Sequence, residues 1–341
     1  MKAAIVRKHG EINVEEAPVP EIQEGEALIK VKYNGICGSD LHVMAGEHKT
    51  AALPVIMGHE FVGELADFKS KEAVDLKVGD HVAAQPYNSC RTCEACITGL
   101  ENVCSKLSII GVHENGGFAE YVKVPLRKVF KLPEEMDLKL AALIEPLAVA
   151  VHDVRQSNFL VGQSAFVIGG GPIGILIALV ARLSGASKVV ISEINEYRSN
   201  FARELGFQVI NPAEEDAAAA ALLMTQGKGF DAVYEVSGTA PGAALMTKVC
   251  KTGGKVVIVG VPTQPVLVDT IDVFSRQLNI IGVRIHSQLN FGAAIGIIES
   301  GVIDEALEKF ITKVYKLDDV KEAMDYSYND KEHFKVLLQV Y

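Results

Sequence analysis

Four of the six cysteines lie within fifteen residues, and their spacing is typical of a metal site. Their order is Cys90-x2-Cys93-x2-Cys96-x7-Cys104. Four thiolates on so short a stretch can surround one zinc ion tetrahedrally. The alternative, four free cysteines in a turn-rich loop, would leave oxidisable thiols exposed. Because a site with four protein ligands has no open position, we expect it to be structural and not catalytic.

A second pattern, Gly169-x-Gly171-x-x-Gly174, fits the loop that binds dinucleotide phosphates. It follows an apolar strand-like run and opens a helix, which is the context that this loop requires. Gly169 would allow a tight turn, Gly171 would let the backbone approach a pyrophosphate, and Gly174 would let the helix pack closely on the sheet. Pro172 and Ile173 fall in the first helical turn, whose amino end favours phosphate. The loop therefore predicts a dinucleotide site.

Glu193 supports the same site, because it ends the next strand-like run, 19 residues after Gly174. A carboxylate there would accept hydrogen bonds from the ribose hydroxyls and would repel a 2′-phosphate, which favours NAD over NADP. Arg198 follows five residues later and could weaken that preference. The alternative interpretation of Glu193 is a surface glutamate at the end of a strand.

Length and composition limit the class of protein. A chain of 341 residues with 49% hydrophobic content can form two domains, each with its own core. The net charge of −10 argues against nucleic acid or an anionic membrane as a partner. The uncharged run at 165–181 contains four glycines and is too short to cross a membrane. With no signal peptide and no disulfide pattern, we expect a cytoplasmic protein.

The pattern of expected secondary structure changes along the chain. Short strands and turns dominate up to about residue 145, with strand-like runs at 27–33, 60–66, 80–84 and 118–124. Strand–helix alternation from about 164 to 284 predicts a doubly wound parallel sheet. One helix is expected to begin with Asn211 as its N-cap, Pro212 at its first position and Glu214 at its third. We expect an α/β protein with a β-rich domain at 1–148 and 286–341 and a Rossmann domain at 149–285.

A second set of candidate metal ligands is less compact: Cys37, His59, Glu60 and Glu145. Taken singly, each has an ordinary alternative, such as a buried thiol, a core histidine or a carboxylate at the end of a helix. The motifs around them are more specific, and they run in order as Gly35-Ile-Cys-Gly-Ser-Asp-Leu-His42, Gly58-His-Glu-Phe-Val-Gly63, Gly116-Gly-Phe-Ala-Glu-Tyr121 and Ile144-Glu-Pro-Leu147. With the cysteines and the glycine loop, these motifs resemble the zinc-containing medium-chain dehydrogenase/reductase family over essentially the whole chain.

Finer features resemble one branch of that family. Glu145-Pro146 is similar to the polyol (sorbitol), threonine and 2,3-butanediol dehydrogenases, whereas ordinary alcohol dehydrogenases are expected to carry a cysteine there. The short interval from Cys37 to His59, together with Gly111-Val-His113, resembles sugar-acid and polyol oxidoreductases. The resemblance implies a GroES-like β-rich catalytic domain, two zinc ions per chain and NAD.

The resemblance also implies a catalytic zinc held by Cys37, His59 and Glu145, with Glu60 bound to it or beside it. Successive side chains on a strand point to opposite faces, so His59 and Glu60 cannot both reach one ion from regular β backbone. Either the backbone bends there or Glu60 binds the metal only in some states. Carboxylate ligands make the site oxygen-rich, which suits chelating substrates such as vicinal diols.

The implied reaction transfers a hydride from a secondary alcohol of a polyol or sugar acid to NAD, with zinc as the Lewis acid that lowers the pKa of the hydroxyl. Ser39 and His42 resemble the family's relay that carries the hydroxyl proton to solvent. The alternative for this segment is a capped helix start with an exposed histidine. Asp40 is assigned no role beyond capping that helix.

Substrate specificity is expected from polar side chains, with His113, Arg284 and His286 as candidates. Arg284 and His286 follow the last strand of the nucleotide sheet, where loops face the ligand. Arg284 could pair with a substrate carboxylate, which would favour a sugar acid; the alternative is a surface or interface arginine. Other functions stay open: an L-threonine or 2,3-butanediol dehydrogenase, or a non-catalytic NAD-binding protein with only a structural zinc. We expect a small-molecule substrate and a homodimer or homotetramer.

Overall fold

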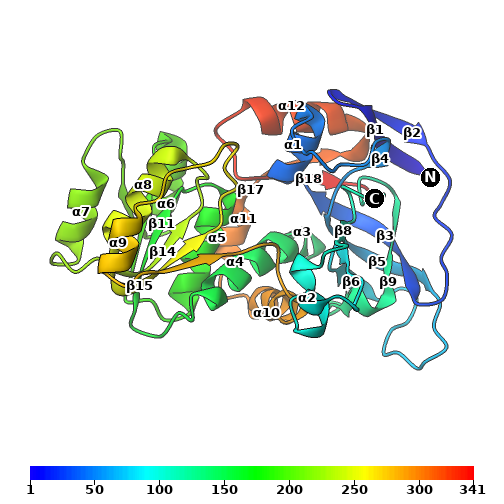
Figure 1. Ribbon diagram of the computed structural model, residues 1–341. Helices are drawn as coiled ribbons and strands as arrows, with labels where there is room; N and C mark the ends of the chain where they lie inside the picture. Colours follow the sequence, from blue (N-terminus) through cyan, green and yellow to red (C-terminus); the bar gives the residue numbers. More distant parts are fainter. The chain divides into compact units, whose positions relative to one another are not determined.

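The computed structural model describes all residues, 1–341, and divides into two compact units (Figure 1). Unit 1 comprises residues 1–148 and 287–341, and unit 2 comprises residues 149–286. The second boundary lies one residue after the position expected from the sequence. No helix is both long enough and apolar enough to cross a membrane.

Unit 2 is built on a six-stranded sheet in the order β13-β12-β11-β14-β15-β16, and every neighbouring pair is parallel. The strand order reverses between β11 and β14, and ligands of such sheets bind at the carboxyl ends of the strands at this point. The strands are β11 (Ser164–Ile168), β12 (Lys188–Ser192), β13 (Gln208–Ile210), β14 (Phe230–Glu235), β15 (Cys250–Ile258) and β16 (Asn279–Gly282). The helices are α4 (Ile144–Gln156), which begins in unit 1, α5 (Pro172–Leu183), α6 (Glu196–Glu204), α7 (Ala217–Met224), α8 (Ala240–Val249) and α9 (Thr270–Ser275).

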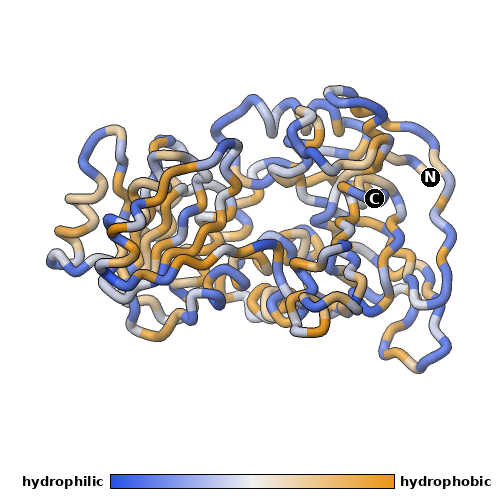
Figure 2. Tube along the Cα trace, in the orientation of Figure 1, coloured by the Kyte–Doolittle hydropathy of each residue, from blue (hydrophilic) through white to orange (hydrophobic).

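The central strands of this sheet, β11 and β12, are mostly apolar, as Figure 2 shows. Phe166, Val190 and Val233 are completely buried. A parallel sheet covered by helices on both faces requires continuous hydrophobic strands of this kind. The core of unit 2 therefore lies between the sheet and its helices, and the loops after the strands are left to bind ligands.

The start of one helix in unit 2 was predicted incorrectly. Asn211 does not cap a helix: it closes a turn in which its carbonyl accepts the Glu214 N–H at 3.0 Å. The helix begins only after Asp216, whose carboxylate accepts the N–H groups of Ala218 and Ala219 at 3.0 and 3.1 Å. Both Asn and Asp favour N-caps, and here the second candidate, five residues later, is the cap because the alanine run follows it.

Unit 1 is β-rich. A seven-stranded sheet follows the path β10-β6-β5-β3-β18-β17, with β9 also paired to β3, beside a three-stranded sheet β2-β1-β4 and a two-stranded sheet β7-β8. The strands are β1 (Lys2–Lys8), β2 (Glu11–Glu16), β3 (Glu26–Gly35), β4 (Val55–Ile56), β5 (Glu60–Phe68), β6 (His81–Ala84), β7 (Tyr87–Asn88), β8 (Ser108–Ile109), β9 (Tyr121–Pro125), β10 (Val129–Lys131), β17 (Ile311–Lys316) and β18 (Lys335–Gln339). The helices are α1 (Gly38–Ala45), α2 (Glu94–Ile97), α3 (Leu138–Ala141), α10 (Gln288–Glu299), α11 (Asp304–Phe310) and α12 (Val320–Asn329), with three short 3-10 helices at η1 (Glu101–Val103), η2 (Leu126–Lys128) and η3 (Leu317–Asp319).

The carboxyl-terminal strand completes the part of this sheet that positions the candidate metal ligands. β18 pairs antiparallel with β3, and β3 pairs antiparallel with β5 on its other side. Gly35 lies opposite Glu60 in one pair and opposite Leu337 in the other. Residues from three distant segments of the sequence therefore meet where β3 ends.

Candidate active site

Cys37, His59 and Glu60 form one cluster, in which one donor atom from each lies within 4.8 Å of the others. The strand β5 begins at Glu60, so His59 lies outside the regular strand. Gly58, just before it, has a left-handed φ of 92°, and a Cβ there would lie 2.3 Å from the Phe118 ring. The chain therefore bends at Gly58, and this bend lets two consecutive side chains face the same point.

Asp40 lies behind the His59 ring and was missed as part of the site. Its carboxylate is completely buried, one oxygen lies 3.6 Å from His59 Nδ1, and the other accepts the Cys37 N–H at 2.9 Å. Histidines that bind metals usually direct their other ring nitrogen to such a carboxylate. Burial alone would lower the pKa of His59, but the charges of Asp40 and Cys37 raise it well above its usual value. Asp40 thus caps α1 and places a buried negative charge beside His59 Nδ1, at a distance slightly longer than a hydrogen bond.

Glu145 opens α4 and acts on the cluster through its charge. That charge acts to raise the pKa of His59, Glu60 and Lys335, but Glu145 is not among the three residues whose donor atoms lie within 4.8 Å of one another. A thiol, an imidazole and carboxylates are the donors that zinc takes in proteins. Several negative groups gathered in one place favour a cation between them. The residues present fit a zinc ion.

Lys335, at the start of β18, is a second residue that the sequence interpretation missed. Its ammonium donates to both oxygens of Glu60, at 2.6 and 2.7 Å, and to the Ile36 carbonyl at 3.1 Å. Burial alone would lower the pKa of Lys335, but Glu60 and Cys37 raise it, so the ammonium stays charged. The available signal was a lysine beside the apolar run Val336-Leu-Leu338.

The two relay candidates lie in different surroundings. Ser39 Oγ is 3.3 Å from His59 Nε2, which places the hydroxyl at the metal cluster. His42 is on the surface, with 56% of its side chain exposed, and its Nδ1 lies 2.6 Å from a Glu47 oxygen. Only Ser39 is therefore directly beside the cluster.

The substrate candidates are also separated. His113 Nε2 lies 3.0 Å from Thr50 Oγ1, and its Nδ1 accepts the Ile109 N–H at 2.9 Å. Arg284 is exposed in the segment after β16. His286 is completely buried. Nearby, the pKa of His152 is lowered to about 4, first by the burial of His152 itself and then by the interaction with His286. This position favours a packing role for His286 and leaves His113 and Arg284 as the candidates for contact with the substrate.

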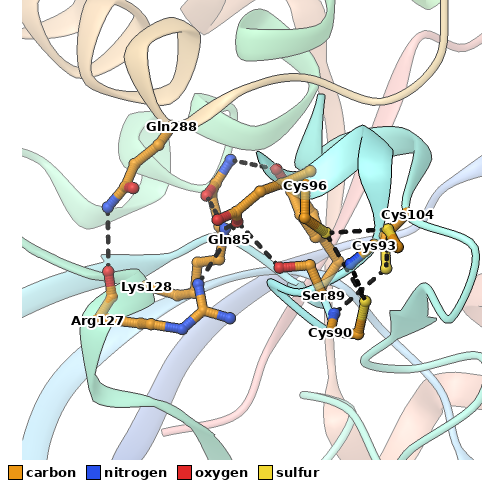
Figure 3. Close-up of polar contacts among 11 residues, drawn as sticks. Gln85, Ser89, Cys90, Cys93, Cys96, Cys104, Arg127, Lys128 and Gln288 are labelled. Atoms are coloured by element: carbon orange, nitrogen blue, oxygen red, sulfur yellow. Dashed lines mark hydrogen bonds and ion pairs between the residues drawn. The ribbon is translucent and has the colours of Figure 1, made fainter. Parts of the chain in front are cut away.

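The four cysteines of the lobe come together in space as their spacing predicted (Figure 3). The sulfur–sulfur distances are 3.5 Å for Cys93–Cys96, 3.9 Å for Cys93–Cys104 and 4.0 Å for Cys90–Cys96. A tetrahedron with 2.3 Å zinc–sulfur bonds has edges of about 3.8 Å. Hydrogen bonds from backbone N–H groups lower the pKa of Cys93 to about 5. The sulfur positions and the stabilised thiolate fit a structural zinc.

The glycine loop lies at the carboxyl end of β11. Gly169 has a left-handed φ of 102°, and a Cβ at Gly174 would lie 1.9 Å from the Gly169 carbonyl oxygen. No other residue fits at Gly174 without moving the turn. Pro172 is the first residue of α5 and Ile173 the second, while Gly171 is the N-cap.

The Glu193 side chain contacts this loop, because its carboxylate accepts the Gly170 N–H at 2.7 Å. The same carboxylate also accepts the Ile194 and Asn195 N–H groups at 2.8 Å. The side chain of Arg198 reaches the same loop: its Nη1 would lie 3.6 Å from a Cβ at Gly171. Its buried Nε has no hydrogen-bond partner in the structure. An acidic and a basic group thus flank the place expected for the ribose.

Comparison with known proteins agrees with this geometry. Residues 23–134 match the alcohol dehydrogenase GroES-like domain, and residues 172–300 match the zinc-binding dehydrogenase domain. The chain is 37% identical over 329 residues to 2-dehydro-3-deoxy-L-galactonate 5-dehydrogenase of Pseudoalteromonas atlantica, covering 96% of this chain and 95% of that protein. It is 38% identical over 318 residues to L-threonine 3-dehydrogenase of Bacillus velezensis, covering 92% and 91%.

A solved structure described as a zinc-binding dehydrogenase of Sinorhizobium meliloti 1021, bound to NADP, matches with a TM-score of 0.92 at 32% identity and covers 99% of each chain. Both relatives and this structure match the chain over almost its entire length, and the two domain models match one segment in each half. The chain therefore belongs to the zinc-containing medium-chain dehydrogenase/reductase family.

Proposed function

We propose that this protein is a zinc- and NAD-dependent dehydrogenase that oxidises a secondary alcohol in a sugar acid or polyol. The observation that carries the proposal is the cluster of the half-buried Cys37 with the buried His59 and Glu60, whose donor atoms lie within 4.8 Å of one another. Zinc, when bound, supplies the Lewis acid that lowers the pKa of the substrate hydroxyl, and NAD accepts the hydride. Cys37, His59 and Glu145 would hold the metal.

The side chains around the cluster then orient groups and move the proton. The Asp40 carboxylate, 3.6 Å from Nδ1, would stabilise a positive charge on the His59 ring and favour the orientation in which Nε2 faces the cluster. Ser39, 3.3 Å from that Nε2, takes the substrate proton and passes its own hydroxyl proton outward. His42 at the surface delivers the proton to solvent.

A hydroxy acid is the substrate class that we favour. The two relatives carry names of dehydrogenases for a sugar acid and for an amino acid, and both substrates contain a carboxylate. Arg284 is exposed after β16 and is the proposed partner of that carboxylate. L-threonine and 2,3-butanediol are the alternative substrates, and a polyol would leave Arg284 without a role in recognition.

NAD is the proposed cofactor because Glu193 holds its carboxylate at the glycine loop. The S. meliloti protein was solved with NADP, so the preference is a property to be measured here. Arg198 is the group that would accept a 2′-phosphate if NADP also binds. A protein that only binds dinucleotide, without catalysis, would need no cluster of metal-binding side chains at Cys37.

NAD reduction by zinc-loaded protein against neutral polyols, aldonic and uronic-derived acids, L-threonine and 2,3-butanediol stereoisomers tests the proposal. We expect turnover with the acids and its loss in Cys37→Ser, with NAD binding retained. Activity on butanediol or threonine alone would select an alternative substrate. No turnover with any compound and one zinc per chain would support the non-catalytic alternative.

A homodimer or homotetramer and a cytoplasmic location complete the proposal. Val261, Leu267 and Phe274, in the segment between β15 and β16, are 89%, 92% and 89% exposed. Ile97 and Leu100 in the four-cysteine lobe are 72% and 50% exposed. Large apolar side chains exposed together often mark subunit interfaces. Sedimentation of Phe274→Ser beside the unmodified protein tests the first of these surfaces.

A further inference from the structure

Two loops of unit 1 bring a pair of histidines together. His48 lies in the loop after α1, and His113 lies in the loop after β8. Their rings meet edge to face, with centroids 6.2 Å apart and an angle of 69° between the planes. The Ala52 N–H donates to the Val112 carbonyl at 3.0 Å, which joins the two loops beside the rings. The pair is therefore held by backbone contacts and not by chance proximity of two side chains.

Hydrogen bonds fix the tautomer of His113. Its Nδ1 accepts the Ile109 N–H at 2.9 Å, so the ring proton lies on Nε2. That Nε2 is 3.0 Å from Thr50 Oγ1 and donates to it. The Thr50 hydroxyl accepts this bond and still has its own hydrogen to donate, and Thr50 is exposed to solvent. His113 thus orients a hydroxyl group that a ligand can reach.

His48 adds a second polar group beside this hydroxyl. It is half-buried, and its Nδ1 is buried without a hydrogen-bond partner. Burial lowers the pKa of His48, and the charges of His113, His42 and His59 lower it further, so the ring is neutral at neutral pH. The effect of His59 also shows that His48 lies within electrostatic reach of the metal cluster. A buried nitrogen without a partner indicates that a polar atom of a ligand completes the site.

The groups gathered here suit a hydroxyl better than a carboxylate. A hydroxyl donates one hydrogen bond and accepts others, which matches a neutral His48 ring and the Thr50 hydroxyl. A carboxylate is bound most strongly by cations. Glu47 and Glu114, which are adjacent to the two histidines in the sequence, bring two negative charges to these loops, and Lys49 brings one positive charge. The charge balance therefore disfavours an anion at this place.

We propose that His48 and Thr50, with Thr50 oriented by His113, form a subsite that binds a substrate hydroxyl two or more carbons away from the carbon that is oxidised. This inference rests on the proposed function, since it places the oxidation at the cluster of Cys37, His59 and Glu60. It makes a polyhydroxylated chain the substrate class, because L-threonine and 2,3-butanediol carry no hydroxyl at that distance from the reacting carbon.

The zinc-loaded protein assayed with NAD on D-sorbitol and on 2,3-hexanediol tests the inference. Both compounds have six carbons and a vicinal pair of secondary hydroxyls, and only D-sorbitol carries hydroxyls farther along. We expect kcat/KM to be higher for D-sorbitol, and we expect His48→Phe, which keeps an aromatic ring without nitrogen, to lower the ratio of the two kcat/KM values at least about tenfold. Thr50→Val, which keeps the shape and removes the hydroxyl, should lower the ratio too. Lys49→Met, an exposed residue between them, is the matched control and should leave the ratio unchanged.

If the protein oxidises only a sugar acid, the inhibition constants of the two compounds against that acid give the same ratio. An unchanged ratio in both His48→Phe and Thr50→Val, or a preference of the unmodified protein for 2,3-hexanediol, would overturn the inference and leave the proposed function intact. Equal losses with both compounds would overturn it too, in favour of a role in loop packing. No oxidation of any compound by the unmodified protein would instead contradict the proposed function, and with it this inference.

Discussion

Lys128 is predicted to fix the four-cysteine lobe to the sheet of unit 1. Its side chain is completely buried, and its ammonium donates to Gln85 Oε1 at 2.9 Å and to Glu101 Oε2 at 3.0 Å (Figure 3). Glu101 in turn accepts the hydroxyl of Ser89, the residue before Cys90, at 3.0 Å. The ammonium also lies 4.3 Å from the centre of the Tyr87 ring. Lys128→Met keeps the apolar stem and removes only these polar contacts.

The magnitude follows from the exposure of each partner. A buried hydrogen bond from a charged group, as to Gln85, contributes about 1.5–3 kcal/mol. The bond to Glu101 contributes at most about 1 kcal/mol, because that carboxylate is 32% exposed and water can replace the lysine. The cation–π contact adds about 0.5–1 kcal/mol, and relief of the desolvation cost of the ammonium offsets part of the total. We expect Lys128→Met to lower the free energy of unfolding by about 2–3 kcal/mol.

Arg127→Met is the matched control. Arg127 is the neighbouring residue, it is 32% exposed, and its guanidinium lies 3.6 Å from the same Glu101 oxygen. Its backbone carbonyl, which accepts the Gln288 amide at 3.0 Å, is unchanged by the substitution. The loss of such a surface pair should cost at most about 1 kcal/mol.

Urea unfolding followed by circular dichroism measures the difference, since the chain has no tryptophan for fluorescence. Release of zinc from the lobe to a chromogenic chelator should be faster in Lys128→Met than in Arg127→Met. Equal losses of stability in the two variants, or equal rates of zinc release, would refute the assignment of Lys128 as the anchor.

Three further substitutions have defined outcomes. Cys93→Ser should bind one zinc fewer per chain and melt at a lower temperature, and an unchanged melting temperature with one zinc fewer would exclude a structural role. Glu193→Ala should raise the ratio of kcat/KM for NADP to that for NAD about tenfold, equivalent to about 1.4 kcal/mol, and an unchanged ratio would remove the ribose contact. Asp153 is 1% exposed, neither of its oxygens has a hydrogen-bond partner, and burial raises its pKa well above the usual value. The unmodified protein should therefore lose stability relative to Asp153→Asn as pH rises above about 4, and a pH-independent difference in melting temperature would contradict this.

The features that the sequence predicted well are those encoded within a short segment. The four cysteines meet because the chain between them is short, and the glycine loop follows β11 because its turn and its helix start are local. The parallel sheet followed from alternation of strand-like and helix-like segments. In each case the determining interactions join residues that are close in the sequence.

The features that were missed depend on distant segments or on a choice between equal local signals. Lys335 and Glu60 are 275 residues apart in the sequence, so only the pairing of β18 with β3 brings them together. Asp40 was predicted only as a helix cap because nothing in the local sequence indicates that it lies behind the ring of His59. The helix after Asn211 was placed too early because Asn211 and Asp216 are both suitable caps, and only the structure shows which one the backbone uses.

The two buried lysines, Lys128 and Lys335, lie behind the two candidate metal groups of unit 1, and each bonds a glutamate. Removing the two lysines should have different consequences, because the glutamates that they bond differ in solvent exposure. Glu101 is 32% exposed, so without Lys128 its charge is hydrated and the result is a looser lobe. Glu60 is 1% exposed, so without Lys335 water cannot compensate its charge. Substitution of Lys128 should therefore loosen the four-cysteine lobe, whereas substitution of Lys335 should leave an uncompensated buried charge beside Cys37 and His59.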